Sequence, residues 1–191
     1  MGKVSFKPGT MIYPLPAVMV SCGENEGEYN ITTVAWTGTV CSDPPMCYIS
    51  LRKDRHSHQI ISRTGQFVIN LTTEQLAAAT DWCGVKSGRD FNKFESMGLT
   101  AVKAPDVNAP MIGESPLNIE CEVVEIKELG SHDMFLSRVV GVLAEESLMR
   151  EDNGLFDLES AGLMAYSHGK YYSLGRRLGF FGFSVQKKKR K

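Results

Sequence analysis

The chain has 191 residues, of which 42% are hydrophobic and 23% charged, and its formal net charge is −1. This composition is ordinary for a globular protein, and the small net charge argues against a general binder of nucleic acids or membranes. No apolar run approaches the ~20 residues of a membrane span. We therefore expect one soluble domain over residues 1–191, with neither nucleic acid nor membrane as a partner.

The N-terminus and the cysteines favour the cytoplasm. Residues 1–10, MGKVSFKPGT, contain no continuous apolar stretch and no signal-like cleavage pattern. The five cysteines include no CxxC pair, which favours reduced thiols over a disulfide framework. His56 and His58 have no third ligand nearby in the sequence, so we expect no metal site.

The first quarter of the chain predicts strands. Residues 17–22, AVMVSC, and residues 31–40, ITTVAWTGTV, form two β-rich runs joined by a turn-rich segment, which predicts a hairpin. Pro44 and Pro45 must interrupt regular structure, because proline has no N–H to donate to a sheet. A further strand is expected at residues 47–51.

A helix and a strand follow. Residues 55–65, RHSHQIISRTG, predict a short helix that ends at the glycine. Residues 66–71, QFVINL, predict another strand. Thr72 and Gln75 then match a capping box at the head of an Ala-rich helix, and one helical turn carrying Phe94 is expected beyond it.

The second half of the chain is dominated by β structure. Residues 100–116 carry three prolines and little periodicity, which indicates a connecting excursion. Residues 117–129 alternate clearly, with Leu, Ile, Cys and Val on one face and Asn and Glu on the other, and residues 133–146 are the expected partner strand. An aromatic stretch at residues 169–185 precedes a basic tail at residues 187–191. The whole pattern favours a mainly β protein, an antiparallel barrel with a few helices.

Common nucleotide and hydrolase motifs are absent. No GxGxxG follows a strand, and neither GxxxxGK[ST] nor GxSxG occurs. A nucleotide would therefore bind on something other than a Rossmann or P-loop frame.

The predicted strand at residues 31–38 is the first candidate binding surface. Alternation divides its side chains into a small-residue face and a second face, the former comprising Thr33, Ala35 and Thr37 and the latter Thr32, Val34 and Trp36. A small-residue face lets a planar ring lie close to the backbone. The same residues also fit an ordinary strand, since Thr and Trp are good strand formers.

Two basic loops are candidate phosphate sites. The first lies where a strand ends and a helix begins, and it contains Arg52, Lys53, Arg55, His56 and Ser57. Backbone donors at a helix N-terminus attract phosphate, as do nearby cations and hydroxyls. The second loop is KSGRD at residues 86–90. Both loops also fit a solvated basic surface.

The order of these motifs resembles the flavin reductase-like family, and most closely its flavoredoxin branch. The resemblance rests on N-x-x-T-x-A-W-x-G, then S-D-P-P, then R-K-x-R-x-S, then T-G-x-F-V-I-N-L, followed by C-G-x-x-S-G-R-x-x-x-K-F. The later segments PLNIECEVVE and GSHDMFLSRVVGV resemble the family's second hairpin. Where the family's flavin reductases often carry T-A-x-S-F, this chain has TVAWTG, which favours the flavoredoxin side.

This resemblance implies an FMN-binding split barrel of antiparallel strands that works as a homodimer and holds FMN without a covalent bond. The positions that it implies for the ring and ribityl chain are Thr33, Ala35, Trp36 and Thr37, with Asn30 and Thr32 as further cofactor-binding residues. Those implied for the phosphate are Arg52, Lys53, Ser57 and His58, and the residues that close the pocket are Ser87, Gly88, Arg89 and Lys93.

Three functions remain open at the level of the sequence. The first is an enzyme that transfers hydride from NAD(P)H to FMN and onward to free flavin, ferric iron or another acceptor. The second is an FMN electron carrier that a protein partner reduces. The third is a flavin-free β-barrel. In the first two the flavin itself takes and gives electrons, so no side chain is expected to be a catalytic acid or base.

Overall fold

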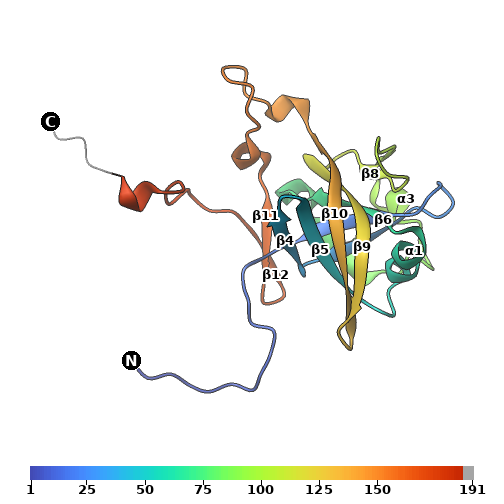
Figure 1. Cartoon of the computed structure of the whole chain (residues 1–191), viewed down its shortest axis with the longest axis horizontal. Coiled ribbons are helices and arrows are strands. Elements are labelled where there is room, and N and C mark those ends of the chain that lie inside the picture. The colour runs from blue at the N-terminus through green and yellow to red at the C-terminus, as the bar shows by residue number, and fades with distance from the viewer. Residues whose placement is uncertain (187–191) are drawn as a thin grey trace.

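The computed structural model describes residues 1–186, and the predicted basic tail at residues 187–191 lies outside this part of the chain. One antiparallel sheet of seven strands organises the molecule (Figure 1). Its strands are β2 (Val18–Cys22), β3 (Asn30–Val34), β4 (Thr37–Ser42), β5 (Pro45–Arg52), β6 (Gln66–Leu71), β9 (Leu117–Glu128) and β10 (His132–Ala144). They lie in the order β3-β2-β6-β9-β10-β5-β4, so β3 and β4 are the two edges.

Helices and short strands surround this sheet. The helices are α1 (His56–Thr64), α2 (Ala77–Val85) and α3 (Lys93–Met97), with 3-10 turns η1 (Glu74–Leu76), η2 (Glu146–Leu148), η3 (Leu158–Ala161) and η4 (Phe183–Val185). The remaining strands are β1 (Leu15–Pro16), β11 (Met164–Ser167) and β12 (Lys170–Ser173), which form a three-stranded sheet, and the pair β7 (Ala101–Val102) and β8 (Met111–Ile112). No helix among residues 1–186 is long and apolar enough to cross a membrane.

A buried apolar cluster joins the strands. Every strand of the large sheet except β4 contributes to it, with Phe67 and Phe135 as the largest side chains. Ile60 and Ile61 of α1 belong to the same cluster. The apolar alternation seen in the sequence therefore points inward, and the predicted mainly β, antiparallel architecture is confirmed.

Several predicted elements are confirmed at nearly their predicted bounds. The hairpin of β2 and β3 is antiparallel, and β9 pairs with β10 over most of their length. Helix α1 ends where predicted, since Gly65 adopts a left-handed conformation with φ 68° and its N–H bonds to the Ile61 carbonyl.

The single strand predicted at residues 31–40 is wrong. β3 ends at Val34 and β4 begins at Thr37, with a bend at Ala35 and Trp36 between them. The bend is needed because β3 pairs with β2 whereas β4 pairs with β5, at the opposite edge of the sheet. The backbone N–H of Ser50 donates to the Trp36 carbonyl at 2.9 Å, which holds the bend against β5.

The predicted capping box at Thr72 and Gln75 is also wrong. The Thr72 hydroxyl donates to the Ala17 carbonyl next to β2, and the 3-10 turn η1 begins only at Glu74, after Thr73. A buried tertiary partner has thus taken the hydroxyl that the local motif would use.

The first polar side chains of β9, Asn118 and Glu120, are buried rather than solvated. Glu120 is 0% exposed, and its Oε2 accepts hydrogen bonds from the Asp106 and Val107 backbone amides at 2.7 and 3.0 Å. These amides belong to the predicted excursion, which packs its own apolar side chains, among them Ala104 and Met111, against the sheet. Polar side chains of β9 therefore bind the excursion to the sheet.

Asn70 on β6 is the centre of this polar layer, and it is 0% exposed. Its Oδ1 accepts from the Ile112 backbone amide at 2.9 Å and from Asn118 Nδ2 at 2.8 Å. Its Nδ2 donates to the Met19 carbonyl at 2.9 Å. One side chain thus holds β2, β9 and the excursion together.

Asn70→Ala should lower the free energy of unfolding by about 3 kcal/mol, because it leaves buried donors and acceptors without partners. Urea denaturation measures this, with Asn108→Ala as the control at an exposed position in the excursion. The control should change stability by less than about 0.5 kcal/mol. Equal effects in the two variants would contradict the role given to Asn70.

Candidate functional site

The sheet does not close on itself, and a pocket lies at the opening. β3 has β2 on one side only, and the pairing of β5 with β4 stops at Ile49. The last residues of β5 therefore face the free edge of β3 across a gap. A cavity of about 390 Å³ occupies this region, which we call the seam pocket. Its strand and bend residues are Thr32, Thr33, Val34, Ala35, Trp36, Ser50, Leu51 and Arg52.

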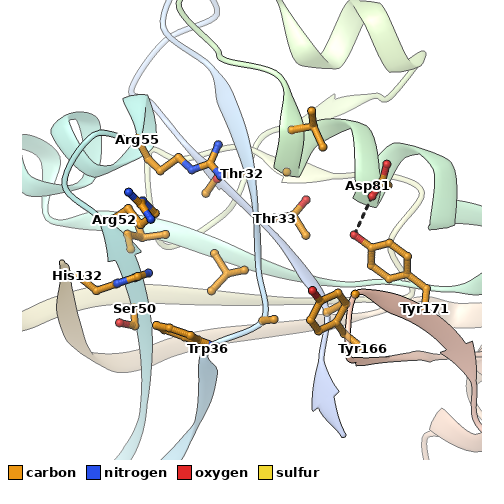
Figure 2. Close-up of a pocket in the computed structure, with 17 residues that line it drawn as sticks. Thr32, Thr33, Trp36, Ser50, Arg52, Arg55, Asp81, His132, Tyr166 and Tyr171 are labelled. Atoms are coloured by element: carbon orange, nitrogen blue, oxygen red, sulfur yellow. Dashed lines mark hydrogen bonds between the residues drawn. The ribbon is translucent and has the colours of Figure 1, made fainter. Parts of the chain in front are cut away.

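The walls of the seam pocket combine aromatic rings with apolar and polar side chains. Trp36 packs on His132 with ring centroids 4.5 Å apart. Figure 2 shows Arg52 and Arg55 on one side of the pocket, and Tyr166 and Tyr171 on the other. Free backbone N–H and C=O groups at a strand edge, between such walls, suit a flat heterocycle with polar edges.

A hydrogen bond across the pocket orders the tyrosine wall. The Tyr171 hydroxyl donates to Asp81 Oδ1 at 3.2 Å and so joins β12 to α2. Burial raises the pKa of Tyr171 to about 12, and the neighbouring Asp81 carboxylate adds to this effect. Tyr171 is therefore a neutral hydrogen-bond donor throughout the physiological range.

Helix α2 comes very close to β3 at the rim of the seam pocket. A Cβ added to Gly84 would lie 3.1 Å from Thr33 Cβ, so a glycine permits this approach. The Thr33 hydroxyl donates to the Thr80 carbonyl of the same helix. These contacts place the end of α2 beside the strand edge.

A second cavity, of about 400 Å³, adjoins the first, and we call it the basic pocket. It shares Thr32, Arg52 and Arg55 with the seam pocket, so these three residues border both cavities. Its other lining residues are Asn30, Asp54, His56, Ser57, Lys86, Ser87, Gly88, Arg89 and Lys93. Five arginines and lysines thus face one carboxylate, which predicts affinity for anions.

The start of α1 adds to this positive potential. The helix begins at His56, its N-cap Arg55 makes no side-chain cap hydrogen bond, and its first turn contains no acidic residue. The first-turn amides and the helix dipole therefore favour an anion at this end. Burial lowers the pKa of His56, as do the nearby Arg89 and Lys93.

Asn30 and Gly88 form the floor between β3 and the 86–90 turn. Asn30 is 3% exposed, and its Nδ2 donates to the Ser57 hydroxyl at 2.7 Å. A Cβ on Gly88 would lie 2.0 Å from Asn30 Oδ1, so only glycine fits there. Asn30 Oδ1 and His56 Nδ1 are buried without a hydrogen-bond partner among the described residues, which marks this floor as suited to a polar ligand.

The structure brings most of the sequence-predicted positions together. Those that line one or both pockets are Asn30, Thr32, Thr33, Ala35, Trp36, Arg52, Ser57, Ser87, Gly88, Arg89 and Lys93. Three others line neither pocket. Thr37 donates to the Tyr48 carbonyl at 2.6 Å, Lys53 Nζ contacts Glu128 at 2.8 Å, and His58 Nε2 contacts Asp133 at 2.8 Å.

The alternation argument for the first strand does not hold in the structure. Thr32 and Thr33 lie on opposite faces of a regular strand, yet both line the seam pocket, as do Ala35 and Trp36. The pocket lies at the free edge of β3 and so meets side chains from both faces of that strand, and the bend after Val34 then turns Ala35 and Trp36 out of the alternation.

Arg55, His56 and Lys86 belong to the two basic loops that the sequence predicted as candidate phosphate sites, although the family resemblance did not assign them to the cofactor, and all three line a pocket. Sequence reasoning missed Asp81 and Tyr166, because the hairpin of β11 and β12 reaches the pocket only through tertiary packing.

The comparisons with known proteins agree on a family. Residues 10–175 match the family model described as flavin reductase like domain. The flavoredoxin of Desulfovibrio vulgaris (Miyazaki F) is 31% identical, with a TM-score of 0.88 over 97% of this chain and 100% of that one. The predicted fold is thereby confirmed as a mainly β split barrel of the flavin reductase type.

Other relatives are more distant. The flavoredoxin from Methanosarcina acetivorans is 24% identical and superimposes with a TM-score of 0.86, over 97% of this chain and 100% of that one. An uncharacterized protein of Archaeoglobus fulgidus is 28% identical over 162 residues, which is 85% of this chain and 89% of that protein.

Lys93 combines burial with a place in the basic pocket. The residue is 3% exposed, and its Nζ donates to the Cys83 carbonyl at 2.7 Å. Burial lowers the pKa of Lys93 from 10.5 to about 8. Between these two values the unfolded chain holds a proton on Lys93 that the folded chain has lost, so stability rises with pH there.

The free energy of unfolding of the native protein, minus that of Lys93→Met, should therefore rise by about 3 kcal/mol from pH 8 to pH 10.5. Below pH 8 both states are protonated, and the difference should be flat. Denaturant unfolding of both proteins at several pH values measures this, and subtraction removes the titration of other groups. A difference independent of pH over the whole range would show that buried Lys93 keeps its ordinary pKa.

Proposed function

The chain belongs to the flavin reductase-like domain family, and on this premise we propose that it binds FMN non-covalently and transfers electrons from NAD(P)H to an acceptor. The family and the likeness to flavoredoxin support a flavin-binding redox function in general. The choice of FMN, of NAD(P)H as donor and of an enzymatic role is our proposal. The observation that carries the finer proposal is that two pockets adjoin along Thr32, Arg52 and Arg55. One has aromatic walls at a free strand edge, and the other is basic at a helix N-terminus.

The shape and charge of FMN are complementary to these two pockets. The isoalloxazine ring is flat and apolar with polar edges, which suits the seam pocket and its strand-edge backbone. The ribityl chain would pass Thr32, which both pockets share. The phosphate would then meet Arg52, Arg55 and the uncapped start of α1. The partnerless polar atoms of Asn30 and His56 offer hydrogen bonds to hydroxyl or phosphate groups.

The chain's own residues would position the cofactor and limit its access to water. When bound, the flavin supplies the hydride and electron chemistry. Trp36, His132, Tyr166 and Tyr171 form the walls beside the ring, and donors directed at the ring's polar edge would stabilise negative charge there. Ser87, Gly88, Arg89 and Lys93 close the phosphate end. We leave Thr37, Lys53 and His58 out of the proposed site, because their side chains make other contacts.

We further propose that the protein works as a homodimer. The first 12 residues of the chain are mostly exposed and extend from the sheet, as does the segment after β12 (Figure 1). These two arms carry exposed apolar side chains, namely Val4, Phe6, Ile12, Leu178, Phe180, Phe181 and Phe183. Apolar arms of this kind are suited to packing on a second copy.

An FMN carrier reduced by a protein partner is the second candidate. The favouring observation is the extent of the likeness to flavoredoxin, which covers the full length of that chain. The TVAWTG sequence at the bend, in place of the T-A-x-S-F that flavin reductases of the family often carry, agrees with it.

An absorption spectrum of the purified protein with FMN, before and after anaerobic NADH or NADPH, tests the function. The flavin bands should bleach rapidly with at least one of the two nucleotides. Bands that bleach only with dithionite would support the carrier instead. A protein that stays colourless with added FMN would contradict both proposals.

The phosphate assignment has its own test. Arg52→Ala and Arg55→Ala should each raise the Kd for FMN by more than about tenfold, since a charge-assisted hydrogen bond is lost. Their affinity for riboflavin, which has no phosphate, should hardly change. Lys53→Ala is the matched control, because Lys53 contacts Glu128 and Asp133 instead. An equal loss for FMN and riboflavin would show that the arginines act on folding or on the ring.

A further inference from the structure

The hairpin of β11 and β12 forms one wall of the seam pocket, and we propose that it is a gate whose latch is the hydrogen bond between Tyr171 and Asp81. This inference rests on the proposed binding of a flavin in that pocket. Tyr166, Gly169 and Tyr171 of the hairpin line the cavity, and Figure 2 shows both tyrosines across the pocket from the arginines. Movement of the hairpin would therefore open this side of the cavity.

The hairpin has the structure of a single rigid unit. Its two strands are antiparallel and pair up to Ser167 with Lys170. The two residues between them, His168 and Gly169, have φ of 47° and 75°. Positive φ at both positions of a two-residue loop is typical of a tight type I′ turn, whose twist matches that of the paired strands. The two strands are therefore expected to move together.

The hairpin is attached to the rest of the protein at its base and along β11. β11 pairs with β1, which continues into β2 through Ala17. At the base, the Met164 N–H donates to the Thr72 carbonyl at 3.1 Å, and the Glu74 N–H donates to the Gly162 carbonyl at 3.0 Å. β12, by contrast, is an edge of the three-stranded sheet. Rotation about the attached side would thus swing β12 away from α2.

One side-chain hydrogen bond holds β12 to α2. The Tyr171 hydroxyl donates to Asp81 Oδ1 at 3.2 Å, as Figure 2 shows. Among residues 1–186, no other side chain of β12 forms a hydrogen bond, and none forms an ion pair. Asp81 is exposed, so water can take the place of the tyrosine when the bond opens. A latch requires such a bond, one that breaks and re-forms readily.

The latch also sets the position of the second tyrosine. Tyr166 and Tyr171 are cross-strand partners on one face of the hairpin, and their ring centroids are 5.5 Å apart. Asp81 and both tyrosines line the seam pocket, so the hydrogen bond joins two walls of the same cavity. Asp81 is thus a positioning residue that acts on the site through Tyr171.

A gate affects binding kinetics differently from a wall that merely contacts the ligand. If the hairpin must open for the flavin to enter and to leave, loss of the latch raises the association and dissociation rate constants together, and the Kd changes little. Loss of a direct contact with the flavin raises mainly the dissociation rate constant, and with it the Kd. Stopped-flow mixing, followed by the change in flavin fluorescence, measures both rate constants.

Tyr171→Phe should raise both rate constants for FMN by about fivefold, because the variant loses one hydrogen bond and keeps the aromatic ring. Riboflavin should show the same increase, since the latch lies at the ring end of the site. Tyr172→Phe is the matched control, because Tyr172 is the next residue of β12, is 51% exposed and lines neither pocket. The control should keep the native rate constants.

Variants of Asp81 test the other half of the latch. Asp81→Ala should match Tyr171→Phe, and the double variant should be no faster than either single variant, because all three lack the same bond. Asp81→Asn keeps an acceptor oxygen and should retain most of the native slowness. Native rate constants in Tyr171→Phe, or additive effects in the double variant, would refute the latch. A rise in the dissociation rate constant alone would replace the gate with a direct contact between Tyr171 and the flavin.

Amide hydrogen exchange of the flavin-free protein tests the latch without a ligand. The amides of β11 and β12 should exchange about fivefold faster in Tyr171→Phe than in the native protein, whereas those of β9 should not change. Unchanged exchange in the hairpin would refute the latch even if FMN binds, and the proposed function would stand. Failure of the native protein to bind FMN would overturn the proposed function and the gate with it, whatever the exchange shows.

Discussion

The unpaired backbone along β3 and at the end of β5, beyond Ile49, is the constraint on which the site depends. The two edge strands of the seven-stranded sheet, β3 and β4, follow each other directly in the chain. The bend at Ala35 and Trp36 lets the chain leave one edge and join the other. The gap that results carries free backbone donors and acceptors, which ordinarily need either water or a ligand. The seam pocket occupies that gap.

The ends of β5 and α2 link the two halves of the site. Strand β5 ends at Arg52 and helix α1 starts at His56, so the strand that borders the seam also delivers the arginines and the helix N-terminus. On the other side, α2 lies against β3 through Gly84 and ends at the 86–90 turn. The junction between β5 and α1 and the junction between α2 and the 86–90 turn therefore lie beside the same strand edge, that of β3. As a result, the aromatic seam pocket and the basic pocket lie next to each other.

A buried polar layer fixes the excursion to the face of the sheet that α2 also covers. Asn70 and Asn118 bind each other and the excursion that covers them, and Glu120 binds two backbone amides of the same excursion. Such side chains cost free energy to bury unless they are paired, so they specify one arrangement of the excursion. The excursion thus covers this face firmly, while the gap between β3 and the end of β5 stays open.

Sequence alone determined several strands of the large sheet, the end of α1, the mainly β architecture and the basic character of the site. Alternation, turn residues and prolines act locally, so β2, β6, β9, β10 and the end of α1 could be predicted from them. The basic segments around Arg52 and Arg89 were likewise visible as composition. Tertiary structure alone decided which of these residues meet. Lys53 and His58 contact Glu128 and Asp133 instead of the pocket, and Tyr171 reaches it from 90 residues beyond its partner Asp81. Partner choice across the fold depends on packing between distant segments, which local patterns do not encode.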